Sequence, residues 1–210
     1  MTVPPSAVEI ASPCDVHGPS LRERLRPHDA DPAFYGLDIE TDTSVDGLDP
    51  TVAAVVAVAI ASAGPTVLFR GDEGQILAAL ADHVRRLPVG IITTWNGTSF
   101  DLPFLAERAL RLGIDIGLDG WRSDIDPAAA WLGHRHVAGY RLYRSDVGRA
   151  LPVSCGLKRM ARLVGLDPVE VDAARIHELD ADVIDRYVAS DAELARALLI
   201  RRWPVSVSAV

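Results

Sequence analysis

The stretch Phe34-Tyr35-Gly36-Leu37-Asp38-Ile39-Glu40 decides the fold that we expect for this chain. Its apolar residues are bulky or β-branched, which indicates a short buried strand. Successive side chains of a strand point to opposite faces. Asp38 and Glu40 therefore share one face of the strand, and the apolar residues that alternate with them share the other.

This pair of carboxylates needs a compensating positive charge. Two carboxylates on one face of a buried strand repel each other and are costly to desolvate. No lysine or arginine lies between Arg26 and Arg70. A divalent cation is the simplest compensation, and oxygen ligands favour a hard ion such as Mg²⁺ or Mn²⁺. The alternative is that the strand ends at Asp38 and that residues 40–49 form an acidic loop.

The overall composition is that of a soluble globular protein, with 49% hydrophobic and 24% charged residues. A length of 210 residues predicts one domain of ordinary size with a sizeable core. The net charge of −8 argues against a protein that coats nucleic acid non-specifically. It leaves open a metal-dependent enzyme that acts on nucleic acid, because bound cations change the local field.

Cysteine usage and hydropathy predict a cytoplasmic protein. Cys14 and Cys155 show no zinc spacing, so we expect two free thiols in a reducing compartment. Residues 1–13 lack the basic segment and apolar run of a signal peptide. The longest apolar run, residues 52–63, is too short to cross a bilayer, and we expect no membrane association.

Beyond the first strand, the chain alternates between strand and helix patterns. Two apolar runs at residues 52–62 and 66–69 follow short turns, so they should be antiparallel neighbours. Residues 73–87 have helical periodicity, and the next apolar run at 89–95 should pair parallel because it follows a helical crossover. A helix over 102–112 comes next. This order predicts an α/β fold.

The second half is less regular. We expect a short helix over residues 126–131 and a strand over 136–143, the latter within a glycine-containing mobile loop. Ser154 should cap a helix that runs to Val164. The last helix should run from Asp182 to Trp203.

Two further aspartates stand at notable positions. Asp191 falls within the apolar stripe of the last helix, and Tyr187 precedes it by one turn, so the two side chains should be neighbours. The alternative is a rotated helix that leaves Asp191 solvated beside Ser190. Asp101 lies where a loop enters the helix over 102–112, and a helix N-cap is its alternative role.

Together these segments resemble the DEDD superfamily of 3′–5′ exonucleases. The three matching motifs are Leu37-Asp38-Ile39-Glu40-Thr41, Asn96-Gly97-Thr98-Ser99-Phe100-Asp101 and Tyr187-Val188-Ala189-Ser190-Asp191. A tyrosine four residues before the last aspartate is typical of the DEDDy variant. The resemblance covers about residues 33–203, and the exonuclease domains of family B DNA polymerases look most similar.

The resemblance implies a ribonuclease H-like α/β fold: a mixed sheet of three antiparallel strands and then parallel strands, flanked by helices. We therefore expect a ribonuclease H-like exonuclease domain over residues 32–204. Residues 1–31 would be a tail or an edge decoration, and residues 205–210 a C-terminal tail.

The resemblance also implies hydrolysis of single-stranded nucleic acid from its 3′ end by a two-metal mechanism, with two Mg²⁺ or Mn²⁺ ions and release of nucleoside 5′-monophosphates. Asp38, Glu40 and Asp191 would hold one ion, while Asp38 and Asp101 would hold the other. Tyr187 would orient the attacking water. DNA is the expected substrate and RNA the alternative. The rival functions are a non-catalytic nucleic-acid-binding domain of the same fold, and an acidic α/β protein whose carboxylates are caps and solvated charges.

Substrate contacts are expected at two places. By the resemblance, Asn96 and Phe100 would contact the 3′-terminal nucleotide, although Phe100 could equally be a core residue. Residues 134–162 hold seven basic side chains and one acidic one, a plausible track for the strand or an ordinary arginine-rich surface. From this segment we select Arg141, Arg144 and Lys158 as strand contacts. His134 and His136 are expected to be solvated strand residues and not metal ligands.

Overall fold

The computed structural model of the chain describes residues 32–118 and 130–208. Their centre is one sheet of six strands in the order β3-β2-β1-β4-β6-β5. The strands are β1 (Ala33–Thr41), β2 (Val55–Ala61), β3 (Val67–Arg70), β4 (Gly90–Thr94), β5 (Ala130–Trp131) and β6 (His134–Ala138). The helices are α2 (Glu73–Arg86), α3 (Asp101–Leu112), α4 (Gly139–Ser145), α5 (Val147–Ala150), α6 (Leu157–Leu163), the 3₁₀ helix η1 (Ala173–Glu178) and α7 (Ala181–Ser208).

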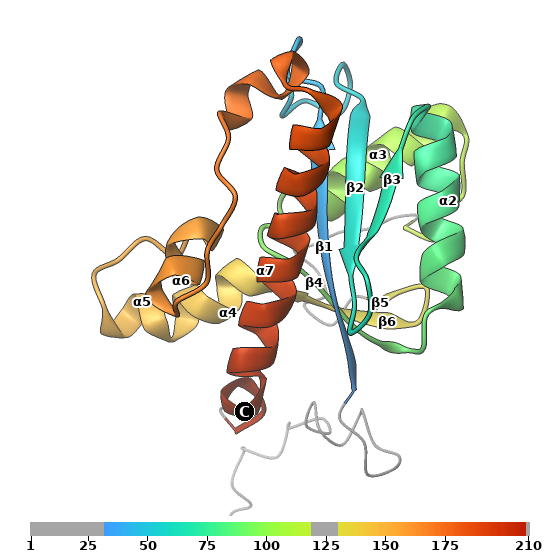
Figure 1. Cartoon of the computed structure of the whole chain (residues 1–210). Coiled ribbons are helices and arrows are strands. Elements are labelled where there is room, and N and C mark those ends of the chain that lie inside the picture. The colour runs from blue at the N-terminus through green and yellow to red at the C-terminus, as the bar shows by residue number, and fades with distance from the viewer. Residues whose placement is uncertain (1–31, 119–129, 209–210) are drawn as a thin grey trace, which may run out of the picture.

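The strand directions confirm the predicted mixed sheet. β1 pairs antiparallel with β2, and β2 pairs antiparallel with β3. On its other side β1 pairs parallel with β4, which pairs parallel with β6. The short β5 closes that edge as an antiparallel partner of β6. Helices cover both faces, with α2 and α3 on one side and α7 on the other (Figure 1).

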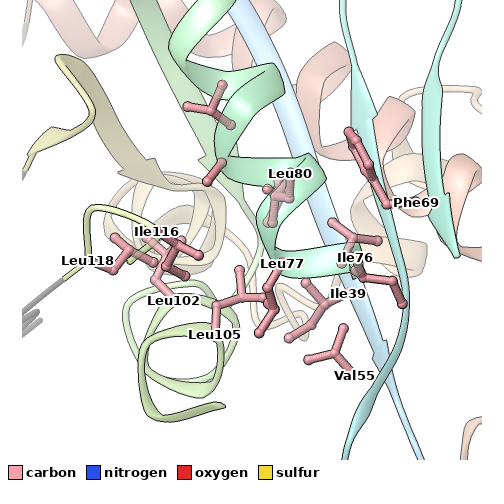
Figure 2. Close-up of a cluster of buried hydrophobic side chains, with 14 of the residues drawn as sticks. Ile39, Val55, Phe69, Ile76, Leu77, Leu80, Leu102, Leu105, Ile116 and Leu118 are labelled. Carbon is pink, nitrogen blue, oxygen red and sulfur yellow. The ribbon is translucent and has the colours of Figure 1, made fainter. Parts of the chain in front are cut away.

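One face of the sheet carries the larger apolar core. Leu37 and Ile39 of β1 point to this face and are buried. Figure 2 shows how side chains from β1, β2, β3, α2 and α3 meet there. α2 is fixed at its start by the Asp72 side chain, which accepts a hydrogen bond from the Gln75 amide. α3 ends at Gly113, whose φ of 67° is the left-handed conformation that favours glycine.

The opposite face of the sheet is lined by small residues, and α7 packs on it. β2 presents Ala57, Ala59 and Ala61 to this helix. β1 presents Gly36, where a side chain would collide with the backbone of Ala192 on α7. The small side chains allow the helix to approach the sheet closely. Since strand residues alternate, Asp38 and Glu40 share the face of Gly36 and therefore lie toward α7.

The structure differs from the sequence prediction in the region after β4. The predicted strand over 136–143 is wrong in its second half, because β6 ends at Ala138 and α4 begins at Gly139. The amide of Tyr140 donates to the Trp95 carbonyl at the end of β4, so the chain turns into a helix there. Residues 139–150, expected to form part of a mobile loop, are the two short helices α4 and α5.

Two further boundaries differ from prediction. Ser154 does not cap α6, which begins at Leu157 after Gly156; the Ser154 hydroxyl instead accepts a hydrogen bond from the Gly156 amide. α7 continues through Pro204 to Ser208, past its predicted end at Trp203. The predicted helix over 126–131 lies outside the described residues except for Ala130 and Trp131, which form β5. The domain limits 32 and 204 stay predictions.

Within the described residues, no helix combines the length and the apolar character that a bilayer crossing demands. Of the two cysteines, Cys155 is a buried free thiol, and Cys14 lies outside the described residues.

Candidate active site

Asp38 and Glu40 lie on β1, on the face of the sheet that α7 covers. They pair with Ala59 and Ala57 of β2, whose small side chains leave the space above the strand to the carboxylates. Both acidic side chains are half-buried. The strand continues to Thr41, so the alternative of a strand that ends at Asp38 is wrong.

Asp191 reaches the same space from α7. Its neighbour Ala192 packs against Gly36, which brings this turn of the helix down onto β1. Asp191 is 6% exposed, so the alternative in which it is solvated is wrong. Ser190 occupies a different position: its hydroxyl accepts a hydrogen bond from the Val169 amide at 3.2 Å.

Asp101 reaches the cluster from the loop after β4. The Asn96 carbonyl accepts hydrogen bonds from the amides of Ser99 and Phe100, which folds residues 96–100 into a tight turn. Asp101 is the first residue of α3 and is only 4% exposed. The N-cap position belongs to Phe100, and no side chain caps the helix, so the N-cap role considered for Asp101 is wrong.

The four residues Asp38, Glu40, Asp101 and Asp191 form what we call the carboxylate cluster. Burial raises the pKa of Asp38 well above its ordinary value, and the negative charges of the other three raise it further. Burial and then the charge of Asp191 raise the pKa of Glu40 to about 8. Burial raises the pKa of Asp101 to about 7. Each carboxylate therefore lies in a crowded, partly dehydrated negative site.

Lys158 of α6 supplies a positive charge to this site. Its ammonium group donates to Asp191 in an ion pair whose side chains are 19% and 9% exposed. The ammonium also lies 4.3 Å from the centre of the Tyr187 ring. The segment before α6 is held at the end of β4, because the Trp95 indole donates to the Cys155 carbonyl. Burial raises the pKa of Asp191, and the hydrogen bond from Lys158 opposes that rise.

The cluster suits a hard divalent cation in ligand type and charge. All of its donors are carboxylate oxygens, the ligands that Mg²⁺ and Mn²⁺ prefer. One lysine does not balance four carboxylates. Among residues 32–118 and 130–208, however, no three His, Cys, Asp or Glu side chains already converge as a set of metal ligands. The residues therefore fit a cation by chemistry, but their side chains are not prearranged around one.

Tyr187 lies one turn before Asp191 and is buried. Burial, and then the charges of Asp191, Glu40 and Asp38, raise the pKa of its phenol. The hydroxyl therefore keeps its proton at neutral pH and remains a hydrogen-bond donor.

The sequence interpretation missed Glu170 and the position of Lys158. Glu170 precedes η1, pairs with Arg162, and raises the pKa values of Asp191 and Tyr187 through its charge. No local periodicity marks Glu170. One feature of the sequence does single out Lys158: it is the only lysine in a chain whose other basic residues, histidines aside, are arginines.

The proposed contacts of the terminal nucleotide lie on the turn that leads to Asp101. Asn96 is exposed. Phe100 is partly buried, packs against the larger core, and lies 5.3 Å from the Phe104 ring. Phe100 thus has a core contact and keeps part of its ring accessible. Arg141 and Arg144 are exposed on α4.

The expectation that His134 and His136 are solvated is wrong. The His134 ring accepts a hydrogen bond from the Gly90 amide and contacts the Val84 carbonyl at 3.1 Å. His136 contacts the Thr94 hydroxyl at 3.0 Å, and burial lowers its pKa to about 4. Both are buried because β6 lies between β4 and β5 and not at an edge.

The chain is an α/β domain with a cluster of carboxylates on one face of its sheet, and comparisons with known proteins show what it is similar to. Residues 30–122 match the family model of the exonuclease domain of family B DNA polymerases. DNA polymerase 2 of Aeropyrum pernix is 27% identical over 108 residues, which cover 49% of this chain and 13% of that protein. The catalytic subunit of DNA polymerase epsilon from Schizosaccharomyces pombe is 29% identical over 136 residues, which cover 61% and 6%.

The fold has a counterpart among solved structures. The family B DNA polymerase of the hyperthermophilic archaeon Pyrobaculum calidifontis superposes with a TM-score of 0.72 at 21% sequence identity, over 87% of this chain and 26% of that chain. The predicted resemblance to family B polymerase exonuclease domains and the ribonuclease H-like fold are thus confirmed. The chain spans only a small part of the length of these relatives.

Proposed function

We propose that this protein is a metal-dependent 3′–5′ exonuclease that shortens single-stranded DNA and releases nucleoside 5′-monophosphates. The observation that carries the proposal is that four carboxylates from three separate elements, β1, α3 and α7, approach closely enough for the charges of the other three to raise the pKa of Asp38. A protein without a use for these charges would be more stable with neutral residues there, since their repulsion raises the free energy of the fold.

The carboxylates have distinct places in the proposed reaction. Asp38, Glu40 and Asp191 would hold one divalent ion, and Asp38 and Asp101 would hold a second. Two such ions, when bound, supply a nucleophile at neutral pH and neutralise charge on the leaving 3′ oxygen.

Tyr187 would orient the attacking water. Its raised pKa keeps the phenol protonated, so the hydroxyl can donate to or accept from a water molecule but cannot serve as the base at neutral pH. Asn96 and Phe100 would hold the terminal nucleotide, because stacking on an aromatic ring tolerates any base. The Lys158 ammonium pairs with Asp191. Once a divalent cation balances the charge of Asp191 instead, Lys158 would be free to contact a substrate phosphate.

One observation favours a second candidate, a domain of the same fold that binds nucleic acid without cleaving it. The Lys158 ammonium pairs with Asp191, one of the four carboxylates. In a non-catalytic domain this ion pair would be permanent, and divalent cations would not displace it.

Product analysis on single strands labelled at the 5′ end separates the two candidates. With Mg²⁺ or Mn²⁺ we expect a ladder of progressively shorter labelled products from DNA, and less or none from RNA. The same mixture in EDTA should leave the strands intact. Binding without shortening in either metal favours the non-catalytic domain, and full cleavage in EDTA contradicts the metal-dependent mechanism.

A further inference from the structure

α4 and α5 line an open pocket that the proposed reaction does not use. Its volume is about 430 Å³, and five residues line it: Arg141, Arg144, Ser145, Gly148 and Arg149. Three of the five are arginines, and none is acidic. We call this the arginine pocket.

The charges of the arginine pocket are not neutralised by the protein. Asp146 is the only acidic residue of α4, α5 and the residue between them, and it pairs with Arg202 of α7. In the described part of the chain, Arg141, Arg144 and Arg149 make no ion pair or hydrogen bond through their side chains. A guanidinium group is always charged at neutral pH and carries five donors. The pocket is therefore a concentrated positive site in a chain whose net charge is −8.

A glycine forms part of the pocket wall. A Cβ at Gly148 would lie 2.9 Å from the Cys155 sulfur and 3.3 Å from the Arg144 Cδ. Any larger residue would press on the stem of Arg144 and on the segment that leads to α6. The close approach at Gly148 thus fixes α5 against Arg144 and keeps the three arginines around one space.

Contacts of α4 place the arginine pocket near the carboxylate cluster but outside it. α4 begins where the Tyr140 amide donates to the Trp95 carbonyl, one residue before Asn96. Farther along, the Tyr143 hydroxyl donates to the Leu198 carbonyl on α7. Leu198 follows Asp191 by two helical turns, about 10 Å along the axis. Figure 1 shows α4, α5 and α6 together beside α7.

We propose that the arginine pocket binds a backbone phosphate of the same single strand whose 3′ end lies at the carboxylate cluster. The inference rests on the proposed exonuclease function. Arginine forks match phosphate oxygens in geometry and charge. Contacts to phosphates position a strand without reading its bases, as an enzyme that removes successive nucleotides requires. α4, which carries part of the pocket, contacts α7 two helical turns after Asp191. The pocket therefore engages a phosphate upstream of the scissile one, and a dinucleotide is too short to reach it.

The test compares strand binding by the parent protein and by the double variant Arg144→Ala/Arg149→Ala. Fluorescence anisotropy is measured with a labelled single-stranded oligonucleotide in EDTA, so that no cleavage occurs. We expect the double variant to bind at least about tenfold more weakly. The slope of the logarithm of the binding constant against the logarithm of salt concentration should be shallower by about 0.7 for each phosphate that the variant no longer neutralises. The control is Arg86→Ala/Arg111→Ala, the same loss of charge on the far face of the sheet, which should bind like the parent.

Two further arms separate this inference from the exonuclease proposal and from a free phosphate site. Hydrolysis of a dinucleotide by the parent in Mn²⁺ tests the exonuclease proposal on its own; absence of hydrolysis overturns the exonuclease proposal and leaves the binding comparison valid. Inorganic phosphate should displace the oligonucleotide only at concentrations far above those of the strand. Equal strand binding by parent and double variant overturns the arginine-pocket proposal, as does a parent that binds inorganic phosphate as tightly as the strand. Both arginines are exposed, so the variants should fold, and melting curves verify this.

Discussion

Gly36 of β1 lies against the backbone of Ala192 of α7 so closely that a Cβ on Gly36 would stand 1.9 Å from the Ala192 carbonyl oxygen. Asp38 is two residues along the strand from Gly36, on the same face, and Asp191 is the neighbour of Ala192. This one backbone contact therefore sets the separation between the first and the last carboxylate of the cluster.

Replacing Gly36 with alanine should push α7 off the sheet. Overpacking of this kind costs about 1–3 kcal/mol of the free energy of unfolding. We expect a lower melting temperature and weaker Mn²⁺ binding, since Asp191 moves with the helix. The matched control is Gly64→Ala, where the nearest atom to a Cβ is the Ser62 hydroxyl at 3.7 Å. A Gly36→Ala variant that melts and binds Mn²⁺ like the control contradicts the role of this contact.

Without metal, the protein should lose stability as pH rises from about 4 toward 8. The unfolded carboxylates titrate near pH 4, while the folded pKa values of Asp101 and Glu40 are about 7 and about 8. Between these limits the folded state binds more protons than the unfolded state, so each rise in pH favours unfolding. Melting temperatures in EDTA at a series of pH values measure the effect.

The same melts distinguish repulsion from a structural role of Asp38. At pH 7 in EDTA, Asp38→Asn should melt higher than the parent, because one repelling charge is gone. Adding Mn²⁺ should stabilise the parent, by about 2.7 kcal/mol at a hundredfold excess over the dissociation constant, and should affect the variant much less. If Asp38→Asn melts lower than the parent, and Mn²⁺ does not change the melting temperature of the parent, Asp38 is a structural residue.

Lys158 should matter most when no divalent cation is present. Lys158→Met leaves Asp191 buried without its partner, which should cost about 1–3 kcal/mol in EDTA. In Mn²⁺ the difference from the parent should shrink, because a cation then balances the carboxylates. Arg159→Met is the control on the same helix, since Arg159 is exposed. Equal losses for Lys158→Met with and without Mn²⁺ would rule out this compensation.

Tyr187→Phe should slow the reaction without abolishing it. The ring keeps its packing against the alanines of β2 and under the Lys158 ammonium, and only the hydroxyl is lost. We expect kcat to fall by about tenfold, equivalent to ~1.4 kcal/mol of transition-state stabilisation, with little change in strand binding. Single-turnover rates with saturating enzyme measure this, and an unchanged kcat removes Tyr187 from the mechanism.

The spacing of apolar residues along the sequence predicted those strands and helices that bury one or both of their faces in the core. The alternation around Asp38 identified β1, and the continuous apolar run identified β2, which is buried on both faces. Helical spacing identified α2 and α3 because each presents one apolar stripe to the sheet. The resemblance drew attention to Asp101 and Asp191, which local rules alone could have assigned to a cap and to solvent.

Features that depend on distant pairing were not predictable in this way. His134 and His136 look like polar strand residues, yet β4 and β5 flank their strand and bury both rings. Lys158 meets Asp191 across 33 positions of sequence, through the packing of α6 on α7. The turn from β6 into α4 is likewise set by a hydrogen bond to Trp95, which no local propensity encodes.

Release of a 3′-terminal label shows whether the carboxylate cluster is the site of cleavage. A single-stranded DNA labelled on its last nucleotide is incubated in Mn²⁺ with the parent, with Asp191→Ala, and with Asp182→Ala, an exposed aspartate on the same helix. We expect the parent and Asp182→Ala to release labelled nucleoside 5′-monophosphate and Asp191→Ala to release none. Release by Asp191→Ala at the rate of the parent would show that the carboxylate cluster is not the site of cleavage.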